Sequence, residues 1–305
     1  MTRLSPTRLV RALPFPYRAP TTPRGVEPAP PRRRTGSDFE TEWARRYPAR
    51  LARLALLEGL MRPTMSVLAP PERRGLDHLD GLEGPVIFAA NHHSHVDTPL
   101  MLTSIPEPWR HRIFVGAAAD YFFGTRVTGA LSALALNAVP IERTKISRSS
   151  ADRAAELIDA GWSLLIFPEG GRSPDGWGQP FRPGAAYLSL RCDVPIVPVH
   201  IAGTGRVLPK GTKRPVRAST TVTFGRPIYP QPDDDTRRLA ARMETAVAEV
   251  ADATATDWWS ARRRAHAGAT PTLSGPDAGG WRRAWALGER RADRRRSRRR
   301  WPELD

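Results

Sequence analysis

The chain has 305 residues, a formal net charge of +16 and 40% hydrophobic residues. Its single cysteine, Cys192, excludes an intramolecular disulfide framework, so we expect a reducing compartment and a buried, unreactive thiol. The longest weakly polar stretch, residues 127–141, is short and is interrupted by Thr, Gly, Ser and Asn. These properties argue against a disulfide-stapled scaffold and against a transmembrane protein.

The positive charge is concentrated at the two ends of the chain. Residues 1–34 carry +7 and residues 261–305 carry +8, so residues 35–260 carry only +1. Polycationic ends are attracted to anionic lipid headgroups or to nucleic acid. We expect no specific nucleic acid partner, because the tails contain no recognisable reading motif, but nucleic acid binding stays an alternative function. A solvated tail without a partner is the third interpretation.

Composition divides the chain into four segments. They are a disordered Pro/Arg-rich tail over residues 1–37, an amphipathic helical segment over 38–70, a central domain over 71–255 and a Trp/Arg-rich extension over 256–305. The fold class is therefore one folded body with basic, partly disordered tails.

The segment before the central domain has a helical pattern of apolar residues. The side chains that recur every three or four positions are Phe39, Trp43, Tyr47, Leu51 and Leu54. This predicts an amphipathic helix from about residue 38 to residue 61, broken or kinked at Pro48. Its apolar side either lies in a lipid headgroup layer or packs on the body.

In the central domain, apolar strands alternate with helices. Strands are expected at 85–90, 112–118, 138–141, 162–167, 195–201 and 219–225. Helices are expected from about 98, and at 127–136, 148–160, 183–191 and 235–251. The alternation predicts an α/β fold, with a mostly parallel or mixed sheet flanked by helices and the strand ends near 91, 142, 168 and 201 at a common cleft.

A histidine and an aspartate follow the first of these strands. His92 and Asp97 lie five positions apart, and on one continuous helix such residues point about 140° away from each other, so a turn must separate them. If Asp97 caps a helix that begins at Thr98, His92 can fold back onto the carboxylate. Such a pair forms a general base for a hydroxyl nucleophile. A capping box from Ser94 to Asp97 and a structural histidine are competing interpretations.

A second polar group follows the strand at 162–167. Glu169, Gly170, Gly171 and Arg172 share one turn, in which glycines let the backbone approach an anion and the guanidinium can grip a phosphate. An ordinary glycine-rich turn with a surface arginine is the competing interpretation.

Three histidines suggest a different chemistry. His93 and His95 form a His-x-His pair, and His200 ends the strand at 195–201, as in some metal-dependent hydrolases. The other histidines lie in no ligand-like spacing, whereas a hydrolytic metal site usually needs three or four ligands. We therefore expect no metal, and metal-dependent hydrolysis stays an alternative.

The order of these motifs resembles the glycerolipid acyltransferase family, typified by lysophosphatidic acid acyltransferases. The first family signature, Asn-His-x4-Asp, matches residues 91–97, and the third, Phe-Pro-Glu-Gly-Thr-Arg-Ser, matches residues 167–173. A middle block ending in arginine matches residues 139–143, and a proline-flanked apolar block matches residues 194–199. The resemblance covers about residues 70 to 230. It departs at Gly171, where the family usually has threonine, and this departure concerns acceptor preference.

The resemblance implies an O-acyltransferase whose catalytic domain spans residues 71–255. In this interpretation His92 deprotonates the hydroxyl of the acceptor and Asp97 orients the imidazole. The residues implied to hold the glycerol-phosphate end of the acceptor are Glu169, Gly170, Gly171, Arg172, Arg143 and, as a weaker candidate, Arg182.

The resemblance also implies substrates and a location. A fatty acyl group would pass from a thioester of coenzyme A or acyl carrier protein to a lysophosphatidic-acid-like lysophospholipid, forming phosphatidic acid without a metal or an organic cofactor. Acylated sugars or amino-acid lipids are alternative products. The protein would be cytoplasmic and peripheral, held on the anionic inner face of the cell membrane.

Overall fold

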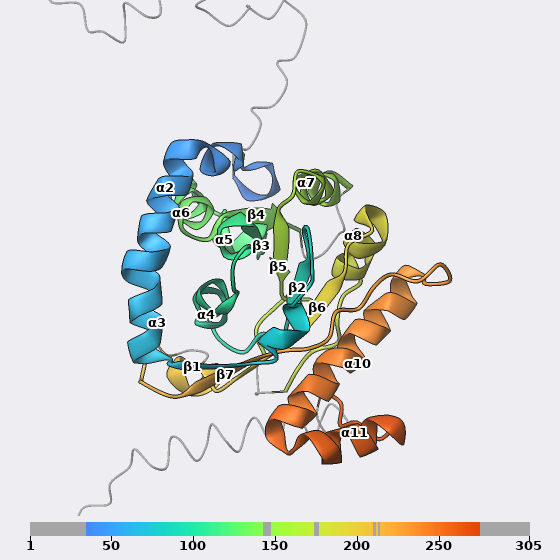
Figure 1. Cartoon of the computed structure of the whole chain (residues 1–305). Helices are drawn as coiled ribbons and strands as arrows, with labels where there is room; N and C mark the ends of the chain where they lie inside the picture. The colour runs from blue at the N-terminus through green and yellow to red at the C-terminus, as the bar shows by residue number, and fades with distance from the viewer. Residues whose placement is uncertain (1–34, 143–147, 174–176, 210–211, 213, 275–305) are drawn as a thin grey trace, which may run out of the picture. The chain divides into compact units, whose positions relative to one another are not determined.

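The computed structural model describes residues 35–142, 148–173, 177–209, 212 and 214–274. Its centre is a sheet of seven strands (Figure 1). The strands are β1 (Pro71–Arg74), β2 (Ile87–Ala90), β3 (Ile113–Ala118), β4 (Ala138–Ile141), β5 (Ser163–Ile166), β6 (Ile196–Ala202) and β7 (Thr220–Phe224).

Helices surround this sheet. The α-helices are α2 (Tyr47–Leu56), α3 (Arg62–Leu68), α4 (Asp97–Ser104), α5 (Ala119–Phe122), α6 (Arg126–Leu136), α7 (Arg148–Asp159), α8 (Gly184–Cys192), α9 (Thr204–Val207), α10 (Thr236–Ala255) and α11 (Trp258–His266). A π turn, η3 (Leu57–Met61), joins α2 to α3, and short 3-10 turns occupy Gly36–Asp38, Glu42–Arg45, Leu76–Leu79 and Arg110–Arg112.

The strand order is β1-β7-β6-β2-β5-β3-β4. The five strands from β6 to β4 are parallel, whereas β7 pairs antiparallel with β6, and β1 pairs parallel with β7. Because parallel strands end at the same edge of a sheet, the loops that follow these five strands converge there. The predicted mixed, mostly parallel sheet flanked by helices is confirmed.

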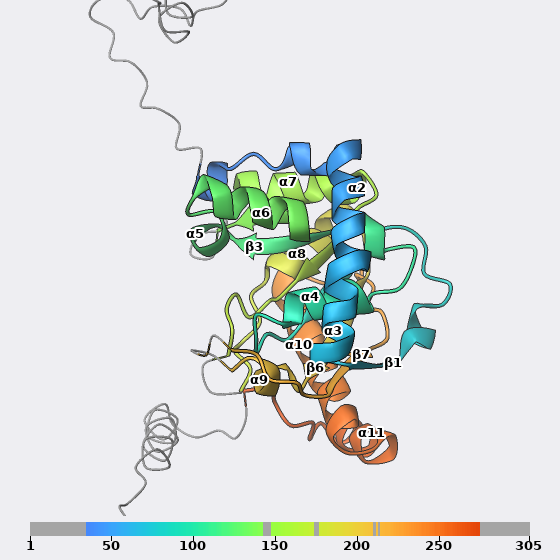
Figure 2. The same ribbon diagram turned by 90° about the vertical axis from the view of Figure 1, so that its left-hand side faces the viewer.

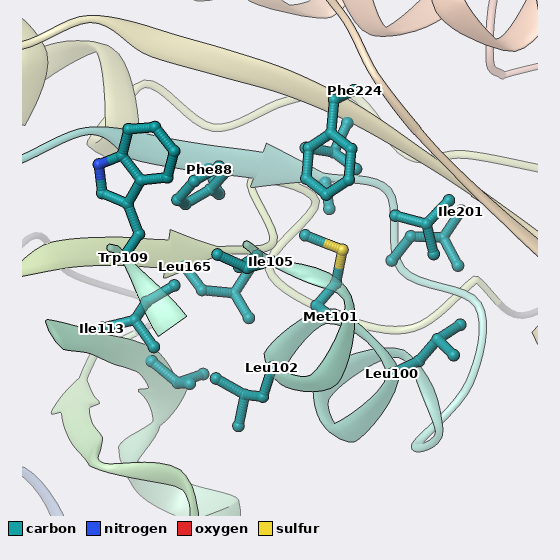
Figure 3. Close-up of a cluster of buried hydrophobic side chains, with 14 of the residues drawn as sticks. Phe88, Leu100, Met101, Leu102, Ile105, Trp109, Ile113, Leu165, Ile201 and Phe224 are labelled. Atoms are coloured by element: carbon teal, nitrogen blue, oxygen red, sulfur yellow. The ribbon is translucent and has the colours of Figure 1, made fainter. Parts of the chain in front are cut away.

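Alternate residues of the strands build one hydrophobic core on each face of the sheet. Phe88 and Ala90 of β2 pack on the side covered by α3 and α4, whereas Ile87 and Ala89 pack on the side of α7, α8 and α10. Figure 3 shows the first core, in which the ring of Phe88 meets Trp109 and Phe224 edge-on, with ring centroids 6.1 and 6.2 Å apart. Burial of these large side chains on both faces holds β2 at the centre of the sheet.

The N-terminal helical segment differs in detail from its prediction. The segment is interrupted at Arg46, whose backbone is extended, so the predicted break lies two residues before Pro48. Pro48 itself lies in the first turn of α2, where no N–H is needed from it. The helical column from α2 to α3 runs across α6 and α4 (Figure 2). Leu57 and Met65 enter the core, which shows that one side of the column packs on the body.

The same column also leaves apolar side chains in solvent. Its large exposed hydrophobic residues are Tyr47, Leu51, Leu54, Leu60 and Val67. Packing on the body is therefore observed for one side of these helices, and placement of the other side in a lipid headgroup layer stays a prediction. Among the residues that the structure describes, no helix is long and apolar enough to cross a membrane.

Several elements were not predicted, among them the short helices α5 and α9, the strand β1 and the helix α11. The edge strand β1 has the sequence Pro-Glu-Arg-Arg and is mostly exposed, so it lacks the apolar alternation that reveals a strand. Helix α11 lies in the Trp/Arg-rich extension.

Cys192 ends α8 as a free, partly buried thiol whose pKa is raised by burial.

Candidate active site

His92 and Asp97 are in direct contact at the end of β2. The imidazole Nδ1–H donates to Asp97 Oδ2 over 2.8 Å. Asp97 is fully buried as the first residue of α4, whereas His92 lines a cavity. With Nδ1 bound to the carboxylate, Nε2 is the nitrogen left to accept a proton. The fold-back inferred from their spacing is therefore present.

The route to this contact differs from the predicted one, because Asp97 does not cap α4 with its side chain. Its Oδ2 instead accepts the backbone N–H groups of His93 and Ser94, over 2.7 and 2.8 Å. The Ser94 hydroxyl donates to the carbonyl oxygen of Leu208 rather than completing a capping box. One carboxylate oxygen thus gathers three donors from the loop and fixes its path into the helix.

Two contacts with residues of other strands and turns also hold the loop in place. Asn91 is buried and pairs twice with the backbone of Ile201 in β6, accepting from its N–H over 2.6 Å and donating to its carbonyl over 2.9 Å. The ring of Phe167 stacks on the His92 imidazole, with centroids 4.2 Å apart. The imidazole is therefore fixed by hydrogen bonding at its edge and by packing on its face.

Glu169 lies behind the loop from His92 to Asp97 rather than on the cavity wall. Its side chain is buried, and its two oxygens accept the backbone N–H groups of His92 (2.9 Å) and Gln179 (3.0 Å). Burial raises the pKa of Glu169 to about 7, although these two hydrogen bonds act to lower it. If Glu169 contributes to acceptor binding as predicted, it does so indirectly, by positioning the backbone at His92 and Gln179.

Gly170 and Arg182 fit against each other. Gly170 has a φ of +69°, and a Cβ added there would lie 2.6 Å from Nε of Arg182. The backbone N–H of Arg182 donates to the carbonyl oxygen of Pro168, which ties the start of α8 to the turn after β5. Glycine at position 170 is thus required both by the left-handed backbone and by the approach of the guanidinium.

Gly171 and Arg172 are less constrained. Nothing lies within 4 Å of a Cβ added at Gly171, and its φ lies outside the left-handed region. No hydrogen bond or ion pair joins the Arg172 guanidinium to another residue in the described part of the chain. Both residues line the cavity, as do Gly170 and Arg182. Arg143, the other predicted phosphate ligand, lies outside the described residues.

The cavity has a volume of about 1030 Å³. His92, Arg172 and Arg182 lie in its wall, and the rest of its lining is mostly apolar. The apolar residues come from β3, β5 and the helices on both sides and include Val115, Ala117, Leu136, Ala154, Ile166 and Leu188. The imidazole of His92, the guanidinium groups of Arg172 and Arg182 and a large apolar surface therefore line the same cavity.

The three histidines considered as metal ligands have different partners. The Asn91 amide nitrogen lies 3.3 Å from Nδ1 of His93. His95 stacks on Tyr121 and hydrogen-bonds its hydroxyl over 3.1 Å, and burial lowers the pKa of His95, with Arg172 and His92 adding to the effect. His200 is partly buried in β6, and burial lowers its pKa to about 4, with His93 adding to the effect. No group of three or more His, Cys, Asp or Glu side chains in the described residues could hold a metal ion.

Sequence comparison agrees with this geometry. Residues 70–202 match the model of the acyltransferase family. The loop from His92 to Asp97 and the turn after β5 both fall inside the matched residues, and the resemblance seen in the motifs is confirmed.

Curated relatives match the same part of the chain. A chloroplastic 1-acyl-sn-glycerol-3-phosphate acyltransferase of Brassica napus is 31% identical over 160 residues, covering 51% of this chain and 44% of the relative. A chloroplastic enzyme of the same description from Arabidopsis thaliana is 30% identical over 142 residues, covering 46% and 38%. The chain thus spans about half of the length of the curated relatives that it matches.

A solved structure shares the fold. The crystal structure of the 1-acyl-sn-glycerophosphate acyltransferase from Thermotoga maritima aligns with a TM-score of 0.53 and 22% sequence identity. The alignment covers 70% of this chain and 86% of that one. The acyltransferase domain and its surrounding helices therefore follow an architecture already observed.

Sequence reasoning missed two residues near the site. Tyr121 follows β3 at the same edge of the sheet as His92 and Arg172, so its place after a predicted strand was a usable signal. Gln179 contributes its backbone N–H to Glu169. Any non-proline residue has that donor, so no side-chain pattern could have pointed to it.

Proposed function

We propose that the protein is an O-acyltransferase that moves a fatty acyl group from a thioester of coenzyme A or acyl carrier protein to the free hydroxyl of a lysophosphatidic-acid-like acceptor. The products are phosphatidic acid and the free thiol. The observation that carries this proposal is the His92–Asp97 pair, whose imidazole lies in the wall of a mostly apolar cavity that Arg172 and Arg182 also line.

In the proposed reaction His92 is the general base. Nε2 takes the proton of the acceptor hydroxyl as its oxygen attacks the thioester carbonyl, and Asp97 stabilises the imidazolium that forms. The tetrahedral intermediate then expels the thiolate, which recovers the proton from His92. Since a thioester is already activated, orientation and base catalysis supply much of the required acceleration.

The acceptor phosphate would bind at the turn after β5. The Arg172 guanidinium has no hydrogen-bond partner among the described residues, and Arg182 lies over Gly170, so a phosphate between them would gain two charge-assisted contacts. Gly171 would leave space beside it. Glu169 would support the site through the His92 and Gln179 backbone, and Arg143 remains a further candidate ligand from the sequence.

The apolar part of the cavity suits the fatty acyl chain. Its volume of about 1030 Å³ is at the upper end of the roughly 300–1,000 Å³ usual for pockets that enclose small molecules. Its shape does not select between phosphatidic acid and the alternative acylated sugars or amino-acid lipids. The two cations favour an acceptor with an anionic headgroup.

We also propose a peripheral position on the cytoplasmic face of the cell membrane. The acceptor and product are membrane lipids, and the α2–α3 column exposes Tyr47, Leu51 and Leu54 beside Arg46 and Arg50. Amphipathic helices of this composition bind the interface of anionic bilayers.

The reaction is tested by incubating the purified protein with lysophosphatidic acid and labelled acyl thioesters of both carriers. His92→Ala should lower kcat by about 1000-fold because the general base is lost. His111→Ala, at the opposite end of β3, should leave kcat unchanged. Full transfer by folded His92→Ala protein would contradict the mechanism.

The acceptor site is tested by Arg172→Ala. Loss of one charge-assisted phosphate contact should raise the KM for lysophosphatidic acid about 10- to 100-fold, while the KM for the thioester changes little. The exposed Arg226→Ala serves as a matched control. A larger effect on the thioester than on the acceptor would refute the assignment of Arg172.

A further inference from the structure

Helix α11 lies outside the family domain and is firmly attached to the body. It packs on α10 (Figure 1). Arg264 donates to both oxygens of Asp252 in α10, over 2.7 and 2.8 Å, and Ala261 is buried beneath the helix. The Asp257 side chain accepts the N–H of Ser260 and caps the first turn. The orientation of the helix is therefore fixed by its inner side.

The outer side of α11 has an unusual composition. Its exposed residues are Trp258, Trp259, Arg262, Arg263 and His266. At about 100° per residue these five positions span one face of about 140°, and no acidic or aliphatic side chain interrupts it. Among the described residues, no ion pair neutralises Arg262 or Arg263.

Exposure of the two tryptophans needs an explanation. Trp258 is 60% exposed and Trp259 is 70% exposed, and the rings meet edge-to-face with centroids 4.8 Å apart. Large aromatic side chains are normally buried when a helix packs on a core, because their transfer from water is strongly favourable. Here the small residue Ala261 faces the body and both indoles face solvent.

We infer that the outer face of α11 binds the surface of an anionic lipid bilayer. Indole rings concentrate at the boundary between headgroups and acyl chains, and arginines beside them can reach the phosphates. The sequence continues this charge, since residues 261–305 carry a net charge of +8. Juxtaposed basic residues strengthen binding to anionic leaflets.

An anionic protein or a nucleic acid would be complementary in charge to Arg262 and Arg263. Neither accounts as well for the exposed pair Trp258 and Trp259. A protein partner would need an apolar pocket for two adjacent indoles, and nucleic acid bases would have to stack on rings already engaged with each other. The bilayer interface accommodates both rings and both charges without such requirements.

The inference names a membrane-binding surface other than the α2–α3 column, because α11 packs on α10, which covers the opposite face of the sheet from α3. It is independent of the acyl transfer chemistry. It is tested with the full chain by sedimentation with phosphatidylglycerol/phosphatidylcholine vesicles and with phosphatidylcholine vesicles alone. Wild-type protein should bind the anionic vesicles more tightly, and less so as salt rises. Trp258→Ala/Trp259→Ala should weaken binding to the anionic vesicles at least tenfold.

Charge and control variants make this test specific. Arg262→Glu/Arg263→Glu should weaken binding to anionic vesicles at least tenfold and have little effect on phosphatidylcholine vesicles. Arg226→Glu/Arg237→Glu, which reverses two exposed arginines elsewhere, and Tyr229→Ala, which removes an exposed aromatic ring, should each reduce binding less than threefold. Circular dichroism confirms that each variant is folded.

Three outcomes would overturn the inference. They are unchanged vesicle binding in both α11 variants, equal losses in the control variants, and binding of wild-type protein to DNA that is tighter than to vesicles and lost in the α11 variants. Acyl transfer in detergent micelles separates this proposal from the proposed function. Variants of α11 that keep acyl transfer activity in micelles but lose binding to vesicles support the inference. Absence of acyl transfer by the wild-type protein in micelles would count only against the proposed chemistry.

Discussion

The loop after β2 and the turn after β5 lie at the ends of adjacent strands, but their side chains are held differently. In the loop, Asp97 accepts three hydrogen bonds, and His92 is also stacked on Phe167. In the turn, Gly171 faces open space and the Arg172 guanidinium has no partner in the described residues. In the proposed reaction, the general base is therefore preorganised by the protein, whereas the proposed anion site would be completed by its ligand.

Of the substitutions considered, Asp97→Asn should have the largest effect, because it disrupts the hydrogen bonds that hold the loop after β2. The amide can present an NH₂ group where three N–H donors now converge, so the imidazole would lose its orientation and its tautomer. We expect kcat to fall about 1000-fold, with a smaller change in KM. The exposed Asp80→Asn is the control, and a decrease of less than tenfold in folded Asp97→Asn protein would contradict the assignment.

Glu169→Gln tests whether one buried carboxylate couples the loop to the turn. Glutamine can accept only one of the two N–H groups that Glu169 accepts, so we expect kcat to fall about 10- to 100-fold at pH 8. The exposed Glu83→Gln should have no effect. Unchanged kinetics would show that Glu169 does not position His92.

The same substitution predicts a change in the pH dependence of stability. Because the pKa of Glu169 is raised from 4.5 to about 7, the folded state binds more protons than the unfolded state between these values. The contribution of Glu169 to the free energy of unfolding therefore decreases as pH rises from about 4.5 to 7. Denaturant unfolding at pH 5 and pH 8 should show that this decrease is smaller in Glu169→Gln.

Gly170→Ala and Gly171→Ala sharpen the comparison within the turn itself. Alanine at 170 would be strained at φ +69° and would displace Arg182, so we expect a loss of about 1–3 kcal/mol in stability and about a tenfold rise in acceptor KM. The Cβ of alanine at position 171 would meet no atom within 4 Å. We therefore expect little change in stability and a change in acceptor KM of less than threefold. Equal effects of the two substitutions would refute the distinction between a structural and an open glycine.

Much of the fold could be predicted because its signals are local. The apolar runs that become β2, β3 and β5 and the helix α10 were visible in the sequence, and their observed ends lie close to the predicted ones. The edge strand β1 was not visible, since its exposed Glu72, Arg73 and Arg74 resemble a loop. The antiparallel pairing of β7 with β6 depends on tertiary contacts that no local pattern records.

The candidate site was predictable to a similar extent. The spacing from His92 to Asp97 predicted their contact, which is observed. The phosphate-binding role that the glycine-rich turn predicts for Arg172 stays a prediction. The spacing could not show that Asp97 serves the preceding loop instead of capping α4. It also could not show that Glu169 points to backbone groups of two separate segments, because such partners are decided by how the strands assemble.

The double hydrogen bond between Asn91 and Ile201 joins residues that are 110 positions apart. During synthesis the loop around His92 leaves the ribosome well before β6 exists, so it cannot yet have this support. The loop from His92 to Asp97 can therefore acquire its final shape only after β6 has been translated and has paired with β2. A nascent chain that ends before residue 201 would contain every residue of the His92–Asp97 motif and still lack the contact that anchors it.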